Sequence, residues 1–320
     1  MQVKKQWGTH SLLFKLPAMT IQLKGLSRAQ RELLAADYRR FTTPPPQHAD
    51  ESCIECRVYQ LPQALLASHE QLTWNGQYAP LQTRTPHGVE LTGINFLAQI
   101  QQESPHIPLT LGVAEEKELA QSIVIENFLR VTTAYRAIQQ GGLLLHSAGL
   151  VYEDEKSEKQ AFIFPGRSNA GKTTLTRKAY QHGARVLSDD INVLLPHEEG
   201  YHAYAVPFTG EFGRTLEHKG GQESYPVAGI ILLEQGEGIR TTKVKNAEAV
   251  AALLAGCPFV NTVAEESTLL FDAVLNLVSR LPVIRLVSGR DGKIDEIMAA
   301  VRKELNLAAQ PNHAQCITTA

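Results

Sequence analysis

Hydrophobic and polar positions divide the chain into a strand-rich front part and an alternating rear part. Residues 27–41 have helical spacing, and Ser27 is a candidate N-cap. Between residues 53 and 113, short apolar runs are separated by proline, glycine and asparagine in the manner of hairpins. We therefore predict a small α+β domain over residues 1–112, in which strands dominate.

The rear part begins with a long amphipathic helix and continues with strands and helices in alternation. Between residues 115 and 140, apolar residues that include Ile123, Phe128 and Tyr135 predict one buried helical face. The alternation that follows is typical of a layered α/β domain, which we place at residues 113–305, before a flexible tail at 306–320. The later predicted elements are strands at 185–194, 227–233 and 282–287 and helices at 173–182, 246–256, 267–281 and 293–305.

Composition and charge narrow the class of protein. The chain has 320 residues and a net charge of −2, so no basic excess points to nucleic acid or to an anionic membrane as the partner. Lys15 and Pro17 interrupt the first apolar stretch, which is too short for a signal sequence. No apolar run approaches the roughly 18 residues of a membrane span. We expect a cytoplasmic protein, and the pattern leaves open whether it forms a homo-oligomer.

The four cysteines are too few for a disulfide framework. Cys53 and Cys56 form a C-x-x-C pair, but a zinc site would need a second pair or histidines at ligand spacing. Cys257 and Cys316 are isolated. We expect reduced thiols close to the start of a strand.

Residues 166–173, with the sequence GRSNAGKT, match every fixed position of the phosphate-loop motif G-x-x-x-x-G-K-[ST]. An apolar strand precedes the loop and a helical pattern follows it, so that backbone N–H groups and the helix N-terminus can face phosphates. Lys172 can contact the β- and γ-phosphates, and the Thr173 hydroxyl can bind Mg²⁺. The nucleotide-binding candidates are Gly166, Arg167, Ser168, Asn169, Ala170, Gly171, Lys172, Thr173 and Thr174.

Two adjacent aspartates, Asp189 and Asp190, follow on an apolar segment. The spacing from Lys172 leaves room for one helix and a returning strand, which would bring the pair beside the phosphates. Neighbouring side chains of a regular strand point to opposite faces, so both carboxylates can act only at a bulge or a strand end. In the alternative, Asp190 is merely solvated at the end of the strand. The loop alone predicts nucleotide binding, and the aspartates favour phosphoryl transfer.

Residues 144–194 resemble the catalytic domain of the HPr kinase/phosphorylase family and, more closely, its uncharacterised relatives. This block combines a histidine-containing strand, a hairpin into the phosphate loop, a helix and the sequence HGARVLSDD, and a weaker similarity continues through residues 205–215, 227–234 and 280–292. The resemblance implies an α/β fold of the HPr kinase and phosphoenolpyruvate carboxykinase type. It also implies transfer of phosphate from ATP, with Mg²⁺, to a serine hydroxyl.

The resemblance further implies roles for individual residues. Asp189 would be the general base, Asp190 would assist it or the metal, and His146 would lie close to the phosphates. The Glu-Arg-Gly signature of the family is not recognisable, and Arg214 is a candidate replacement that would stabilise transition-state charge. The catalytic candidates are Asp189, Asp190, His146 and Lys172, and the metal-binding candidates are Thr173, Asp190 and Glu211.

Three hypotheses of function remain at this point. The first is an ATP- and Mg²⁺-dependent kinase for a serine, or another, hydroxyl of a protein or peptide. The second is a small-molecule kinase on the same scaffold. The third is an ATP-sensing binding module without catalysis, in which residues 1–112 form a docking surface.

Overall fold

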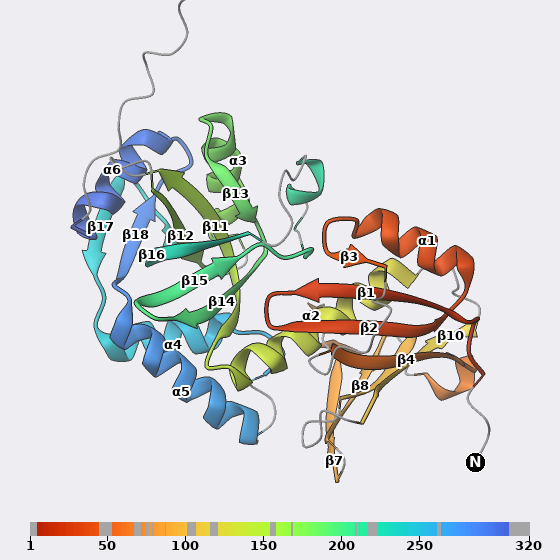
Figure 1. Ribbon diagram of the computed structural model, residues 1–320. Coiled ribbons are helices and arrows are strands. Elements are labelled where there is room, and N and C mark those ends of the chain that lie inside the picture. The colour runs from red at the N-terminus through yellow and green to blue at the C-terminus, as the bar shows by residue number, and fades with distance from the viewer. Residues whose placement is uncertain are drawn as a thin grey trace, which may run out of the picture. The chain divides into compact units, whose positions relative to one another are not determined.

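The computed structural model in Figure 1 divides the chain into two compact units. One unit contains Met1–Arg136 and Phe259–Ser267, and the other contains Ala137–Pro258 and Thr268–Ala320. The sequence-based boundary lies earlier, at residue 112, because the long helix α2 (Gln121–Gln139) falls mostly within the first unit. The structure describes residues 5–44, 53–66, 72–74, 77–78, 80–86, 88–100, 107–115, 121–153, 158–167, 169–208, 210, 212–216, 223–260 and 264–306. All but the first residue of the predicted tail at 306–320 therefore lies outside the described residues.

The first unit is built on an eight-stranded sheet with the order β3-β1-β2-β4-β10-β9-β8-β7. Helix α1 (Arg28–Asp37) follows the second strand, and a short pair, β5 (Thr73–Trp74) and β6 (Gln77–Tyr78), lies outside this sheet. The strands of the sheet are β1 (His10–Leu16), β2 (Met19–Leu26), β3 (Thr42–Thr43), β4 (Cys53–Leu61), β7 (Leu81–Thr85), β8 (Gly88–Gly93), β9 (Phe96–Ile100) and β10 (Leu109–Ala114).

Local sequence signals account for both helices of this unit. The Ser27 hydroxyl accepts a hydrogen bond from the Gln30 backbone, and the Gln30 side chain accepts one from the Ser27 backbone, which is a complete capping box. This confirms the predicted N-cap. Phe128 and Tyr135 of α2 are buried as expected, whereas Ile123 is 68% exposed. The predicted buried face of α2 therefore does not extend to Ile123.

The second unit holds an eight-stranded mixed sheet with the path β12-β11-β14-β15-β16-β18-β17 and with β13 paired to β11. Because β12 also pairs with β16, the strands β12, β11, β14, β15 and β16 form a closed ring (Figure 1). The strands are β11 (Leu143–Glu153), β12 (Lys159–Pro165), β13 (Arg185–Ser188), β14 (Ile191–His197), β15 (Gly200–Tyr204), β16 (Ser224–Gln235), β17 (Ile239–Lys243) and β18 (Val283–Ser288).

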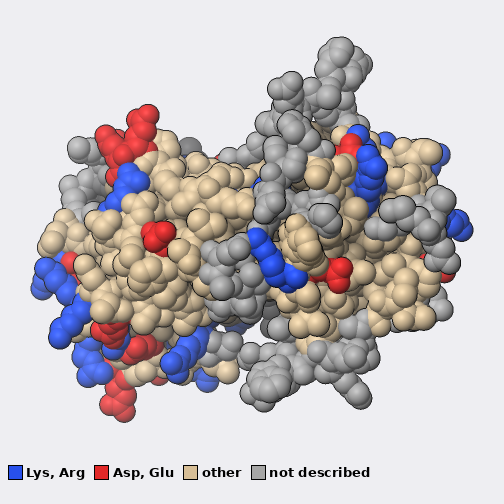
Figure 2. Space-filling view, turned by 90° about the horizontal axis from the view of Figure 1, so that it is seen from below, with Lys and Arg blue, Asp and Glu red and all other residues tan. Residues whose placement is uncertain are grey.

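The helices of the rear part lie close to their predicted positions. They are α3 (Lys172–Gln181), α4 (Asn246–Gly256), α5 (Ala264–Arg280) and α6 (Ile294–Glu304). Among the described helices, none combines the length and apolar character of a membrane span. Charged side chains of both signs are interspersed with wide uncharged areas on the face shown in Figure 2.

One hydrophobic core supports the elements that carry the predicted site. Phe162 and Phe164 of β12 are fully buried in it, together with Leu175 of α3 and Ile297 of α6. Burial of a side chain of this size stabilises a fold by about 1.5–3 kcal/mol. Strand β12 and helix α3, which flank the predicted phosphate loop, are therefore held by the same core.

The described cysteines form no disulfide, as predicted. Cys56 and Cys257 are buried, and this burial raises the pKa of both thiols, that of Cys257 to about 12. Cys316 lies outside the described residues.

Candidate functional site

The predicted phosphate loop joins β12 to α3, in the strand–loop–helix context that the motif requires. Gly171 is the N-cap of α3 and has a φ of 100°, a conformation that favours glycine. At Gly166, an added Cβ would lie 2.9 Å from the Ala170 Cβ, so the loop closes tightly on itself. Ser168, a predicted member of the loop, lies outside the described residues.

The Lys172 amine lies inside this loop. It donates hydrogen bonds to the carbonyl oxygens of Gly166, at 2.7 Å, and Arg167, at 3.0 Å, and the residue is only 7% exposed. Burial lowers the pKa of Lys172, while the negative charge of Asp190 opposes this effect. A phosphate oxygen near this amine would supply the counter-charge that the buried ammonium group needs.

The first turn of α3 follows the predicted phosphate loop directly. The first N–H groups of a helix have no partner within the helix, and its positive dipole end attracts anions. Thr173 and Thr174 are both exposed on this turn. The described loop residues therefore lead directly into Lys172 and the two threonines at the N-terminus of α3.

The predicted strand 185–194 is interrupted at the two aspartates, which lie in a bend between β13 and β14. The Ser188 hydroxyl accepts hydrogen bonds from the backbone N–H groups of Asp190, at 3.2 Å, and Ile191, at 3.1 Å. It also donates one to the Phe208 carbonyl. The strand break that the sequence analysis required thus exists, and Ser188 stabilises it.

The Asp189 carboxylate points to the backbone of a neighbouring segment. Its Oδ1 accepts a hydrogen bond from the Gly210 N–H at 2.8 Å, and its Oδ2 accepts one from the Phe212 N–H at 3.1 Å. Asp189 is 4% exposed, and a Cβ added at Gly210 would lie 2.6 Å from Oδ2. These contacts suit a residue that holds a segment in place.

The Asp190 carboxylate, in contrast, contacts a side chain of β11. Its Oδ1 lies 3.1 Å from Nδ1 of His146, and the two side chains are 23% and 36% exposed. Its charge also acts on Lys172. The structure therefore places His146 and Asp190, two of the four predicted catalytic residues, in direct contact, and the charge of Asp190 acts on a third, Lys172.

A buried hydrogen-bond network fixes this group to β11. The Ser147 N–H donates to the Asp190 carbonyl at 2.9 Å, next to His146 on the same strand. The Asn192 amide donates to the Ser147 carbonyl and hydroxyl at 2.8 and 3.0 Å. Gly149 makes room for this amide, because a Cβ there would lie 2.2 Å from Asn192 Oδ1. Sequence analysis missed Asn192 and Gly149, since neither belongs to a recognisable motif.

The segment held by Asp189 also packs against α3. The Phe212 ring contacts the Tyr180 ring edge to face, with centroids 6.0 Å apart, and the Arg177 guanidinium lies 5.5 Å from the Phe212 centroid. Glu211, predicted as a metal ligand, and the side chain of Arg214 lie outside what the structure describes. Asp189 thus attaches this segment to the bend between β13 and β14, and Phe212 attaches it to α3.

Within the described part of the chain, no group of three or more His, Cys, Asp or Glu side chains could hold a metal ion. A magnesium ion that enters with a nucleotide needs fewer protein ligands, because phosphates and water complete its coordination. The exposed Thr173 hydroxyl and the partly exposed Asp190 carboxylate are oxygen ligands of the kind that Mg²⁺ prefers.

Comparison with known proteins gives one family. Residues 112–301, which contain the whole loop and both aspartates, match the model described as SynChlorMet cassette protein ScmC. No curated protein matches the chain.

Proposed function

The chain belongs to the SynChlorMet cassette protein ScmC family, and we propose that it is an ATP- and Mg²⁺-dependent kinase, similar to HPr kinase, that acts on a serine, or another, hydroxyl of a protein or peptide. The observation that carries this proposal is the contact between Asp190 and His146, together with the effect of the Asp190 charge on Lys172, which lies in the phosphate loop. A cytoplasmic location belongs to the same proposal, since ATP is the phosphate donor.

The loop and the first turn of α3 bind the phosphates in this proposal. The Lys172 amine exchanges its contacts with the Gly166 and Arg167 carbonyls for phosphate oxygens. Phosphoryl transfer leaves little covalent work to the protein, so that positioning and neutralisation of charge contribute most of the rate. A lysine already placed inside the loop serves both purposes.

The pair of Asp190 and His146 accepts the proton of the attacking hydroxyl. In the tautomer that donates Nδ1–H to Asp190, the Nε2 atom of His146 is available as the proton acceptor. The carboxylate then stabilises the positive charge that develops on the ring. The partial exposure of both side chains gives an acceptor hydroxyl access to the pair.

Magnesium would be held by Thr173, Asp190 and the phosphates, and it would supply neutralisation of the charge on the transferred group. Asp189 has a different role in this proposal. It keeps the segment of Gly210 and Phe212 beside the bend between β13 and β14. Asp189 is therefore a positioning residue that does not contact the reacting atoms.

The proposal is tested by incubation of the purified protein with γ-labelled ATP and a protein extract of its source, followed by identification of the labelled species. The expected result is a labelled protein or peptide that resists hydroxylamine, as a phosphoserine does. Lys172→Ala is the control, because removal of the loop amine should abolish the label. Labelled small molecules without labelled protein would indicate a small-molecule kinase instead. ATP binding without transfer to any acceptor would indicate a binding module.

A further inference from the structure

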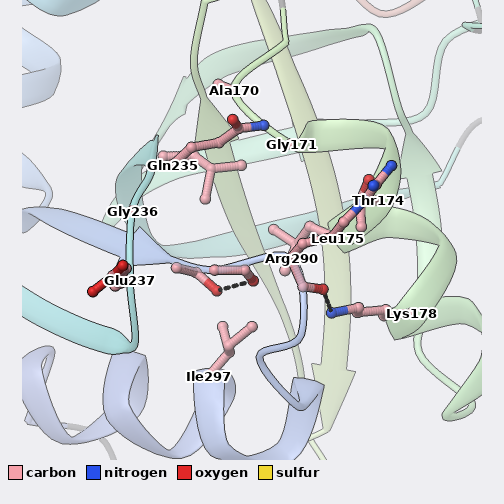
Figure 3. Close-up of a pocket in the computed structure, with 13 residues that line it drawn as sticks. Ala170, Gly171, Thr174, Leu175, Lys178, Gln235, Gly236, Glu237, Arg290 and Ile297 are labelled. Carbon is pink, nitrogen blue, oxygen red and sulfur yellow. Dashed lines mark hydrogen bonds between the residues drawn. The ribbon is translucent and has the colours of Figure 1, made fainter.

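A cavity of about 610 Å³ adjoins the phosphate loop in the second unit. Its walls come from four places, namely the loop with α3, the end of β16, the segment after β18 and helix α6 (Figure 3). The volume falls within the range of about 300–1,000 Å³ that is usual for small-molecule and cofactor sites. The residues that line it include Gly171, Thr174, Gln235, Ser288, Arg290 and Ile297.

The cavity shares a wall with the phosphate loop but not with the proposed reaction centre. Gly171 and Thr174 line it, and both belong to the phosphate-binding turn. His146, Lys172 and Asp190 are not among the residues that line it. A single ligand that occupies both places must therefore be long, with anionic groups at the loop and an uncharged part in the cavity.

Two hydrogen-bonded ties hold the cavity against the loop and its helix. The Lys178 amine of α3 donates to the carbonyl oxygen of Arg290 (Figure 3) and to that of Gly292, at 2.7 Å. The Gln235 side chain donates to the Asn169 carbonyl at 2.6 Å. These ties mean that the cavity walls keep their place relative to the loop before any ligand arrives, which lowers the entropic cost of binding.

The cavity has an apolar inner wall and a polar rim. Leu175, Leu233 and Ile297 line the inner wall and are buried, and Ile297 extends toward the cavity from α6 in Figure 3. Glu237 and Arg290 line the cavity and are exposed at its rim. An apolar wall suits the face of a flat ring, and a rim with charged groups suits hydroxyls and the polar edge of that ring.

We infer that this cavity binds the base and ribose of a nucleoside triphosphate whose phosphates lie on the loop. This inference rests on the proposed function and deepens it, since it assigns the nucleoside part of the ATP donor to the residues of this cavity. The acceptor then approaches from the end of the loop where His146 and Asp190 lie, because the nucleoside fills the other end.

The test compares ATP with inorganic tripolyphosphate, which carries the phosphates without the nucleoside. Isothermal titration calorimetry in the presence of Mg²⁺ should show that the protein binds ATP at least about tenfold more tightly than tripolyphosphate. Ser288→Phe places a ring in the cavity, and we expect it to weaken ATP binding about tenfold or more while tripolyphosphate affinity changes less than about twofold. Glu237→Trp is a second variant at the exposed rim and should act in the same direction.

Ser279→Phe is the matched control, because Ser279 is exposed on α5 and does not line the cavity. It should leave both affinities unchanged, and thermal melting verifies that each variant is folded. Unchanged ATP affinity in both folded cavity variants, or an equal loss of both ligands, would overturn the inference while the proposed kinase stands. Failure of the wild-type protein to bind either ATP or tripolyphosphate would instead overturn the proposed function itself.

Discussion

Oδ1 of Asp190 lies 3.1 Å from Nδ1 of His146, whereas both oxygens of the adjacent Asp189 accept hydrogen bonds from backbone N–H groups. The two carboxylates therefore face different partners although they are neighbours in the chain. Ser188 creates this difference, because its hydroxyl binds the N–H groups of Asp190 and Ile191 and so ends the strand there. Removal of one carboxylate should therefore have consequences unlike removal of the other.

His146→Gln should lower the rate of phosphate transfer by about 10²-fold or more, because general acid–base groups contribute on this scale. The affinity for ATP should change little, since His146 does not belong to the loop. Single-turnover transfer from γ-labelled ATP measures the first quantity and calorimetry the second. An unaltered transfer rate in the folded variant would show that His146 does not accept the proton.

Asp189→Asn should destabilise the second unit by about 1–3 kcal/mol, because its amide cannot accept hydrogen bonds at both former oxygen positions. One of the N–H groups of Gly210 and Phe212 would then lose its acceptor. Denaturant unfolding measures the free energy, and proteolysis near residues 208–216 reports on the released segment. Wild-type stability and protection of this segment would contradict the role assigned to Asp189.

Gly149→Ala should destabilise the protein strongly, because the new Cβ would lie 2.2 Å from Asn192 Oδ1. Asn192→Ala alone should cost about 1–3 kcal/mol through its lost bonds to Ser147. In the double variant the clash disappears, so its loss of stability should be smaller than the sum of the two single losses. If urea unfolding shows that the two losses in free energy of unfolding add strictly, Gly149 and Asn192 are not in contact.

Stability should fall at acid pH through His202. Burial, followed by the nearby His197 with its ring 4.1 Å away, lowers the pKa of His202 from its usual 6.5. The unfolded chain then binds more protons than the folded one between the two pKa values. The contribution of His202 to the free energy of unfolding is therefore complete above about pH 6.5. It is lost as the pH falls through the pKa of His202 in the folded protein.

His202→Gln should consequently show a smaller drop in melting temperature between pH 7.5 and pH 5 than the wild-type protein. His182→Gln, at the exposed end of α3, serves as the control and should keep the wild-type drop. Equal drops in the wild-type protein and in His202→Gln would contradict this assignment.

The sequence predicted the elements wherever hydrophobic periodicity was strong. Helix α4 has the predicted bounds of 246 and 256, and Ser27 caps α1 through its side chain. Strand β17 was missed because its sequence, IRTTK, has little apolar character and its pairing with β18 is a tertiary contact. The hairpin of β1 and β2 was also missed, because Lys15 and Pro17 interrupt the apolar pattern of this stretch.

The candidate site was predictable in its membership but not in its geometry. The loop motif and the adjacent aspartates can be recognised in the sequence by residue type and spacing. Asp189 binds the N–H groups of Gly210 and Phe212, more than twenty residues further along the chain, and this contact distinguishes it from Asp190. No local pattern encodes that contact. The sequence resemblance implies a base role for Asp189, whereas we propose that the pair of Asp190 and His146 accepts the proton.

The central claim is that Asp190, and not Asp189, belongs to the reacting group. Single-turnover transfer from γ-labelled ATP to the identified acceptor should be compared in Asp190→Asn and Asp189→Asn, both at a temperature where the variants are folded. We predict that Asp190→Asn loses transfer by about 10²–10⁴-fold, whereas Asp189→Asn keeps a rate within about tenfold of the wild-type protein. Full transfer by folded Asp190→Asn, with transfer abolished in Asp189→Asn, would contradict the account.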